Sequence, residues 1–258
     1  MAAQPSPGPP LIAVAHGSRD PRAAATVEEL LAGVRRARPG LDARAAYLDH
    51  AAPSPASALA GLDEAVVLPL LLTAAYHSKV DLPAALRAAS ARRPGLRVRL
   101  GAPLGPHPLL IAALERRLAE AGVDIGDPGT AVVLVSAGSS DRRANAVIAQ
   151  VAEAWARLRP WWSVTPAYAS AAAPTPEEEV RRLLGAGAPR VVVAPYLLAP
   201  GHFSDKVRQA ALAAGAHRVA GVLGAAPELV TIVLQRYGEA LEAAPAAVGG
   251  EAPAAVTA

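Results

Sequence analysis

The stretch that decides the fold is VVLPLLLTAAYHSKVDLP, residues 66–83. It opens with an unbroken apolar run, which is typical of a strand buried on both faces of a parallel sheet. It then becomes polar at Tyr76, His77 and Lys79, just before a helix that Pro83 opens. Because ligands bind beyond the carboxyl ends of the strands in open α/β sheets, a histidine at this place indicates a functional site.

Strands and helices alternate on both sides of this stretch. Apolar runs predict strands, and longer amphipathic segments bounded by Pro or Gly predict helices. The predicted strands cover 11–15, 43–48 and 96–103, and the predicted helices cover 23–39, 82–91 and 108–121. Such alternation favours βαβ units and a parallel sheet.

The same order of motifs then occurs a second time. Residues 132–146 resemble 11–25 at a shift of 132 − 11 = 121, and residues 192–207 resemble 66–81 at a shift of 192 − 66 = 126. We therefore predict an α/β protein of two similar flavodoxin-like domains, each a parallel four-stranded sheet with flanking helices, and an active site in the cleft between them. The predicted parts are a disordered arm at 1–10, a site-bearing domain at 11–122, a linker at 123–130, a second domain at 131–242 and a disordered tail at 243–258.

Composition excludes several kinds of chemistry. The chain contains no cysteine, so disulfides, thiolate metal sites, a cysteine nucleophile and a cysteine-ligated iron–sulfur cluster are ruled out. The net charge of +3 comes from scattered residues, which gives no reason to expect nucleic acid as a partner. No run of 18 apolar residues indicates a membrane span, and the first residues lack the features of a signal peptide, so we expect a cytoplasmic protein.

Two histidines carry the strongest chemical signal. His16 and His77 both follow apolar strands, and a flavodoxin-like strand order makes those strands neighbours. Neutral imidazoles bind first-row divalent metals and also accept protons. The alternative is that each histidine only completes a turn. Asp49, at the end of the second strand, could orient an imidazole or bind the metal, or it could be an ordinary turn residue.

The two halves differ at these positions. Ala137 and Phe203 replace His16 and His77 in the second half, and Ser170 replaces Asp49, while the glycines and prolines of the turns are kept. We therefore expect one site, in the first half, with the second half as its roof.

Basic and polar residues surround the two histidines. Cationic side chains at this place suit anionic groups of a substrate, although solvated loop charge is the common alternative. Each Gly-Ser turn also leads into a helix whose first N–H groups could bind a carboxylate. Neither turn is a Walker A loop, so we expect no ATP. The predicted substrate-binding residues are Ser18, Arg19, Arg22, Tyr76, Lys79, Ser139 and His202.

Four segments together resemble the sirohydrochlorin chelatases, which are class II tetrapyrrole chelatases. They are AHGSRDP at 15–21, AYLDHAAPS at 46–54, LPLLLTAAYHSKVDLP at 68–83 and LGPHPLL at 104–110. The resemblance implies ATP-independent insertion of Co²⁺ or Fe²⁺ into sirohydrochlorin, in cobalamin or sirohaem biosynthesis, with no cofactor beyond the substrate metal. It also implies that His16 and His77 are the metal-binding and catalytic residues, with Asp49 as a looser metal ligand.

The duplicated form looks like the longer members of this family, in which two chelatase domains are fused. A monomer is then expected, because the internal repeat supplies the pairing of domains. Two alternatives on the same fold remain: a non-catalytic carrier of a tetrapyrrole or metal, and a ferrochelatase for a haem-pathway porphyrin. A histidine phosphatase is disfavoured, because Ala15 stands where that chemistry needs an arginine.

Overall fold

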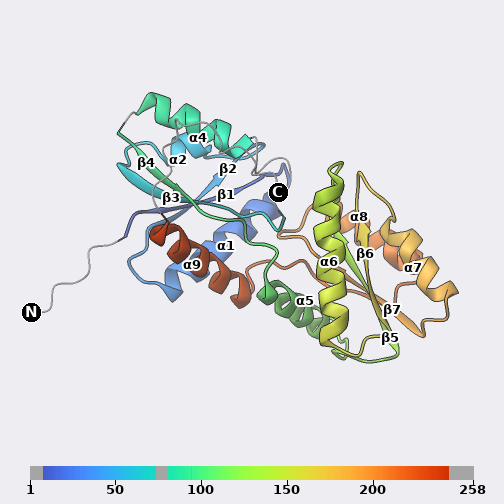
Figure 1. The fold of residues 1–258 in the computed structure, drawn as a ribbon. Helices are drawn as coiled ribbons and strands as arrows, with labels where there is room; N and C mark the ends of the chain where they lie inside the picture. Colours follow the sequence, from blue (N-terminus) through green and yellow to red (C-terminus); the bar gives the residue numbers. More distant parts are fainter. Residues whose placement is uncertain (1–7, 74–80, 94, 244–258) are drawn as a thin grey trace, which may run out of the picture.

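A computed structural model of the chain describes residues 8–73, 81–93 and 95–243. It shows two lobes side by side, each built on a four-stranded parallel sheet (Figure 1). The first sheet has the order β2-β1-β3-β4 and the second has the order β6-β5-β7-β8. The strands are β1 Leu11–Ala15, β2 Ala43–Tyr47, β3 Glu64–Pro69, β4 Arg97–Leu100, β5 Thr130–Ser136, β6 Ser163–Tyr168, β7 Arg190–Pro195 and β8 Arg218–Val219.

Helices cover both faces of each sheet. They are α1 Pro21–Ala37, α2 Pro55–Ala58, α4 Asp81–Arg92, α5 Pro108–Glu120, α6 Arg142–Leu158, α7 Pro176–Gly185, α8 His202–Ala213 and α9 Pro227–Glu242. The duplicated α/β fold and its flavodoxin-like strand order are thus confirmed, with β1 directly between β2 and β3. The predicted strand at 96–103 is shorter, since β4 ends at Leu100 and Gly101 packs so closely on Leu68 that a side chain there would collide with it.

The central strands β1, β3, β5 and β7 are buried on both faces, as their apolar runs indicated. Along β1, Leu11 and Ala13 face one core, while Ile12 and Val14 face another on the opposite side of the sheet. Burial on both faces leaves little room for polar side chains within these central strands, whereas the edge strands carry some, such as the exposed Arg44 in β2. The carboxyl ends of these central strands are therefore where polar side chains can gather.

The last described helix of each half packs on the sheet of the other half. Helix α9 lies against α1, β3 and β4 of the first lobe, and α5 lies against β7 of the second (Figure 1). The exchange is reciprocal in its hydrogen bonds as well. Arg117 on α5 donates to the carbonyl oxygen of Leu223 at 2.8 and 3.1 Å, and Arg236 on α9 donates to that of Pro103 at 3.0 Å.

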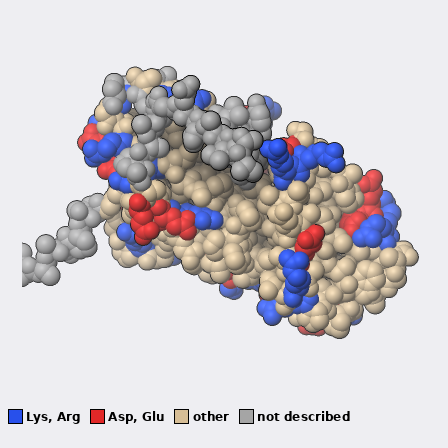
Figure 2. All heavy atoms as spheres, viewed as in Figure 1, with Lys and Arg blue, Asp and Glu red and all other residues tan. Residues whose placement is uncertain are grey.

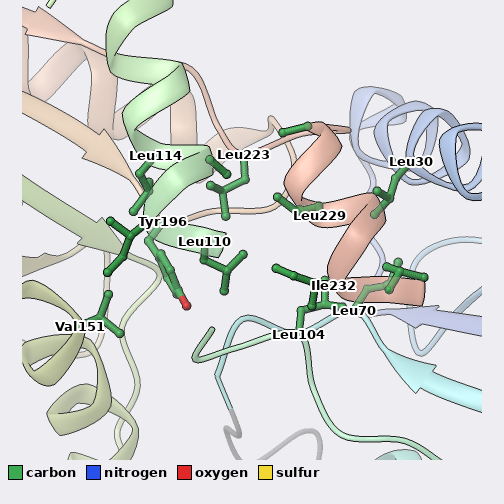
Figure 3. Close-up of a cluster of buried hydrophobic side chains, with 14 of the residues drawn as sticks. Leu30, Leu70, Leu104, Leu110, Leu114, Val151, Tyr196, Leu223, Leu229 and Ile232 are labelled. Carbon is green, nitrogen blue, oxygen red and sulfur yellow. The ribbon is translucent and has the colours of Figure 1, made fainter. Parts of the chain in front are cut away.

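This exchange creates one apolar core common to both lobes. Figure 3 shows Leu110 of α5 and Ile232 of α9 in the same cluster as Leu70, Leu104 and Tyr196. Two further cores lie on the outer faces of the two sheets, under α2 and α4 and under α7 and α8. The two lobes therefore share one continuous hydrophobic core.

Charged residues are scattered over the surface. Figure 2 shows Lys and Arg in small groups, several of them next to Asp and Glu, with uncharged surface between them. Among the described residues, no helix is both long and apolar enough to cross a membrane.

Candidate active site

His16 is the first residue beyond the carboxyl end of β1. The backbone ladder between β1 and β2 continues past the strand ends, with the N–H of Leu48 donating to Ala15 at 3.1 Å and that of Asp49 donating to His16 at 2.9 Å. The backbone of His16 is therefore fixed by the sheet. Its side chain is exposed at the sheet edge.

Gly17 permits this arrangement. It has φ of +95°, in the left-handed region, and a Cβ atom there would collide with the carbonyl oxygen of Asp49. Gly138 has the same conformation and the same close approach to Ser170 in the second lobe. The two lobes thus share one backbone frame, but only the first carries an imidazole on it.

The carboxylate of Asp49 lies beside the imidazole of His50. Its Oδ2 atom is 3.2 Å from Nε2 of His50, and its Oδ1 atom accepts the N–H of His50 at 2.8 Å. His50 itself has φ of 60°, as Ala171 has 57° in the second lobe. His50 is not among the predicted site residues. Its position directly after Asp49 in the sequence indicates a further imidazole at this edge of the sheet.

Ser18 and Ser139 complete equivalent turns. The Oγ atom of Ser18 accepts the N–H of Asp20 at 3.1 Å, and that of Ser139 accepts the N–H of Asp141 at 3.0 Å. Each aspartate then caps its helix, because Asp20 accepts the N–H of Arg22 and Asp141 accepts that of Arg143. Carboxylates of the chain itself therefore occupy the helix N-termini that were predicted to receive a carboxylate of the substrate.

Arg22 joins the two lobes. Its guanidinium donates to Asp20, with a shortest distance of 2.6 Å, and to Asp205 on α8, also at 2.6 Å. Hydrogen bonds to these two carboxylates raise the pKa of Arg22, and the bond from Arg22 lowers the pKa of Asp20. Arg19 is exposed, and none of the described carboxylates pairs with it.

The first turn of α8 meets the first lobe at this edge. A Cβ atom on Gly201 would lie 3.9 Å from Cβ of Asp20, and Asp205 follows one turn later. His202 is exposed at the start of this helix, with its ring centroid 6.2 Å from that of Phe203. The structure thus brings the turn that carries His202 next to the turn that follows His16.

Three predicted residues, Tyr76, His77 and Lys79, lie outside the described residues. The chain that leads to them is well anchored. The N–H of Leu70 donates to Val14 at 2.8 Å, which continues the pairing of β3 with β1. The hydroxyl of Tyr196, from the second lobe, donates to the carbonyl oxygen of Leu72 at 3.2 Å, and burial raises the pKa of this phenol.

Within the described parts of the chain, no group of three or more His, Asp and Glu side chains is placed to hold a metal ion. The predicted pair of His16 and His77 stays a prediction, because its second member is not described.

The protein is thus a two-lobed α/β protein with the same turn after the first strand of each lobe. In the first lobe this turn begins with His16, and in the second lobe it begins with Ala137. A family model described as CbiX matches residues 10–121 and again residues 131–240. The chain therefore belongs to the CbiX family, and the resemblance to the sirohydrochlorin chelatases is confirmed at the level of the family.

Individual relatives agree with this assignment. The chain is 31% identical over 150 residues to a protein of Priestia megaterium named sirohydrochlorin cobaltochelatase; the match covers 55% of this chain and 49%, about half, of that protein. The structure titled SirB from Bacillus subtilis with Fe³⁺ is similar with a TM-score of 0.75 and 25% identity, over 89% of this chain and 94% of the other. A cobalt complex of the sirohydrochlorin chelatase SirB from Bacillus subtilis subspecies spizizenii shares the fold, with a TM-score of 0.71 and 22% identity over 90% and 94% of the two chains.

Proposed function

We propose that this protein inserts a divalent metal, Co²⁺ or Fe²⁺, into sirohydrochlorin without ATP. The observation that carries the proposal is the match of the CbiX family to both lobes, in a chain that places His16 at the carboxyl edge of its first sheet. The names of the similar proteins, a sirohydrochlorin cobaltochelatase and SirB with iron or cobalt, support the same substrates.

The chemistry requires a metal-binding group and a proton acceptor close together. Insertion of M²⁺ into a tetrapyrrole displaces two pyrrole N–H protons, so one imidazole would deliver the metal and another would accept a proton. His16 is exposed on a backbone that the β1–β2 ladder holds in place. β3, which pairs with β1, leads to the segment that contains His77. We assign the two roles to this pair, with Asp49 as an additional ligand or orienting group.

The substrate has eight carboxylates, which would be matched by cations around the edge. Arg19 is exposed three residues after His16 in the sequence and is the described residue best suited to bind one of them. Lys79, in the segment that contains His77, would add a second cation. Arg22 is already paired with two carboxylates, so it can bind a substrate carboxylate through two hydrogen bonds only by exchange.

The test is an insertion assay with purified protein, sirohydrochlorin and either Co²⁺ or Fe²⁺, followed by the change in tetrapyrrole absorbance with no nucleotide present. The proposal predicts insertion faster than the spontaneous rate at the same metal concentration. Binding of sirohydrochlorin without any acceleration would instead identify a carrier. Faster insertion into a dicarboxylate porphyrin than into sirohydrochlorin would identify a haem-pathway ferrochelatase.

The same assay with both metals in competition addresses the physiological metal, and with it the cobalamin or sirohaem pathway. Cobalt and iron differ too little in their preference for imidazole ligands to be distinguished from the residues. We further propose that the protein works as a cytoplasmic monomer, because one chain supplies both lobes. Gel filtration at the mass of one chain, 26.2 kDa, is the expected result.

A further inference from the structure

The ion pair between Arg22 and Asp205 bridges the two lobes at the edge where His16 lies. Arg22 is in the first turn of α1, just after the His16 turn, and Asp205 is in the first turn of α8 in the second lobe. Nη2 of Arg22 is 2.6 Å from Oδ2 of Asp205, and Nη1 is 3.4 Å from Oδ1. Arg22 is 50% exposed and Asp205 is 51% exposed, so the pair is open to solvent and to a ligand.

Two helix N-termini face each other here, and each brings an aspartate. Helix N-termini carry partial positive charge, so Asp20 and Asp205 stabilise the ends of α1 and α8. The same two carboxylates also pair with Arg22. Arg22 uses Nε and Nη2 for Asp20 and both Nη atoms for Asp205. One N–H of Nη1 is left, so a further carboxylate can form a two-bond pair with this guanidinium only if one aspartate leaves.

Asp205 is the aspartate that can leave. Asp20 is the N-cap of α1 and accepts the N–H of Arg22, so its loss would uncap the helix. Among the described residues, only Arg22 donates to the carboxylate of Asp205, and a solvent-exposed ion pair contributes little stability. Replacing Asp205 by another carboxylate on Arg22 therefore costs little free energy.

The ion pair is also not repeated at the equivalent position of the second lobe. Arg143 occupies the position of Arg22 in the second lobe, with the same backbone hydrogen bond to the capping aspartate. No carboxylate within the described residues pairs with the side chain of Arg143. Among the described residues, the ion pair is therefore made by the arginine that follows the His16 turn and not by its equivalent in the second lobe.

We propose that Asp205 holds the place of a substrate carboxylate on Arg22. On this proposal, which rests on the proposed function, a carboxylate of the tetrapyrrole displaces Asp205 when it binds, and one ion pair between the lobes is exchanged for one between protein and substrate. Asp205 is then an internal competitor that weakens substrate binding. Arg22 is a substrate-binding residue that can form a two-bond pair with a substrate carboxylate only through this exchange.

The experiment measures binding of metal-free sirohydrochlorin by absorbance titration, in the wild type, Asp205→Asn, Arg22→Gln and the double variant. Asp205→Asn should lower the Kd about two- to five-fold, since it removes a competitor of the strength of an exposed ion pair. Salt should reduce this gain, because the exchanged charges are exposed. Arg22→Gln should raise the Kd, and Asp205→Asn should have no effect on the Kd in the Arg22→Gln background.

The matched control is Asp42→Asn. Asp42 pairs with Arg44 at 2.6 Å, both are 45% exposed, and the pair lies at the opposite, amino end of the first sheet. This variant should bind as the wild type does, and thermal unfolding should show that all variants are folded.

An unchanged or raised Kd in Asp205→Asn, or a gain that persists without Arg22, would overturn the inference while leaving the proposed function intact. A wild-type protein that neither binds nor metallates sirohydrochlorin would contradict both.

Discussion

Gly17 and Asp49 are packed so closely that the carbonyl oxygen of Asp49 occupies the space where a side chain of residue 17 would begin. This contact sets the separation of the β1 and β2 ends and the backbone of His16 between them. Gly138 and Ser170 repeat the contact in the second lobe. The backbone of both lobes therefore requires this close approach, and the first lobe has a histidine next to it.

Gly17→Ala should therefore destabilise the protein strongly. The left-handed conformation costs an alanine about 1–2 kcal/mol, and the collision with Asp49 should bring the loss in the free energy of unfolding to about 3 kcal/mol or more. Chemical denaturation measures this loss. Gly40→Ala is the control, because Gly40 has φ of +88° with nothing within 4 Å of the added atom, so only the conformational cost should appear. Equal losses at the two positions would refute the role of the contact.

Tyr196→Phe tests whether the second lobe supports the site of the first. It removes the hydroxyl that donates to Leu72, which should cost about 1 kcal/mol of stability. Because Leu72 leads to the segment that contains His77, we also expect kcat for metal insertion to fall several-fold with little change in KM. Tyr237→Phe removes a similar hydrogen bond, to Pro9 at 2.7 Å, at the amino end of the first sheet. Tyr237→Phe should lower stability without changing kcat. The same fall in kcat in both variants would argue against a role of Tyr196 in supporting the site of the first lobe.

The exchanged helices predict that the lobes unfold together. Without α9, the inner face of the first sheet and the apolar face of α1 would be exposed. Calorimetry should therefore show one transition, with the calorimetric and van't Hoff enthalpies in agreement. Two separate transitions would mean that the shared core does not couple the lobes.

His107 predicts part of the pH dependence of stability. It caps α5 by accepting the N–H of Leu109 on Nδ1 at 3.1 Å, and burial, followed by the nearby charge of Arg236, lowers its pKa. The unfolded chain then binds the proton more readily, so the contribution is present above the unfolded pKa of about 6.5 and is lost as the pH falls below it. His107→Asn keeps a capping side chain that does not titrate. Stability measured from pH 7 to pH 5 should fall less in this variant than in the wild type; equal slopes would contradict the role of His107.

The sequence predicted the parts of the fold that depend on local pattern and repetition. Apolar runs such as Leu11–Ala15 and the spacing between the halves identified the strands, their parallel arrangement and the duplication. The exchange of α5 and α9 was not predicted. The apolar face of a helix shows that it is buried, but not which sheet buries it.

The candidate site was predicted only in part. Residues 16 and 49 do meet, through the hydrogen bond between their backbones, because parallel strands end at one edge. The pairing of Arg22 with Asp205 could not be found from the sequence, since the two residues are 183 positions apart and each alone resembles an ordinary surface charge. Ser18 and Ser139 were assigned to the substrate, and the structure shows each completing a turn.

The most direct test of the central claim is the rate of Co²⁺ and Fe²⁺ insertion into sirohydrochlorin by His16→Ala and His77→Ala. Loss of a metal ligand or a proton acceptor should reduce the rate at least about 100-fold in each variant, with thermal unfolding unchanged. His202→Ala should matter less. His217→Ala is the control, because this exposed histidine precedes β8, away from the carboxyl edges of the sheets. Near wild-type rates in both His16→Ala and His77→Ala would contradict the account.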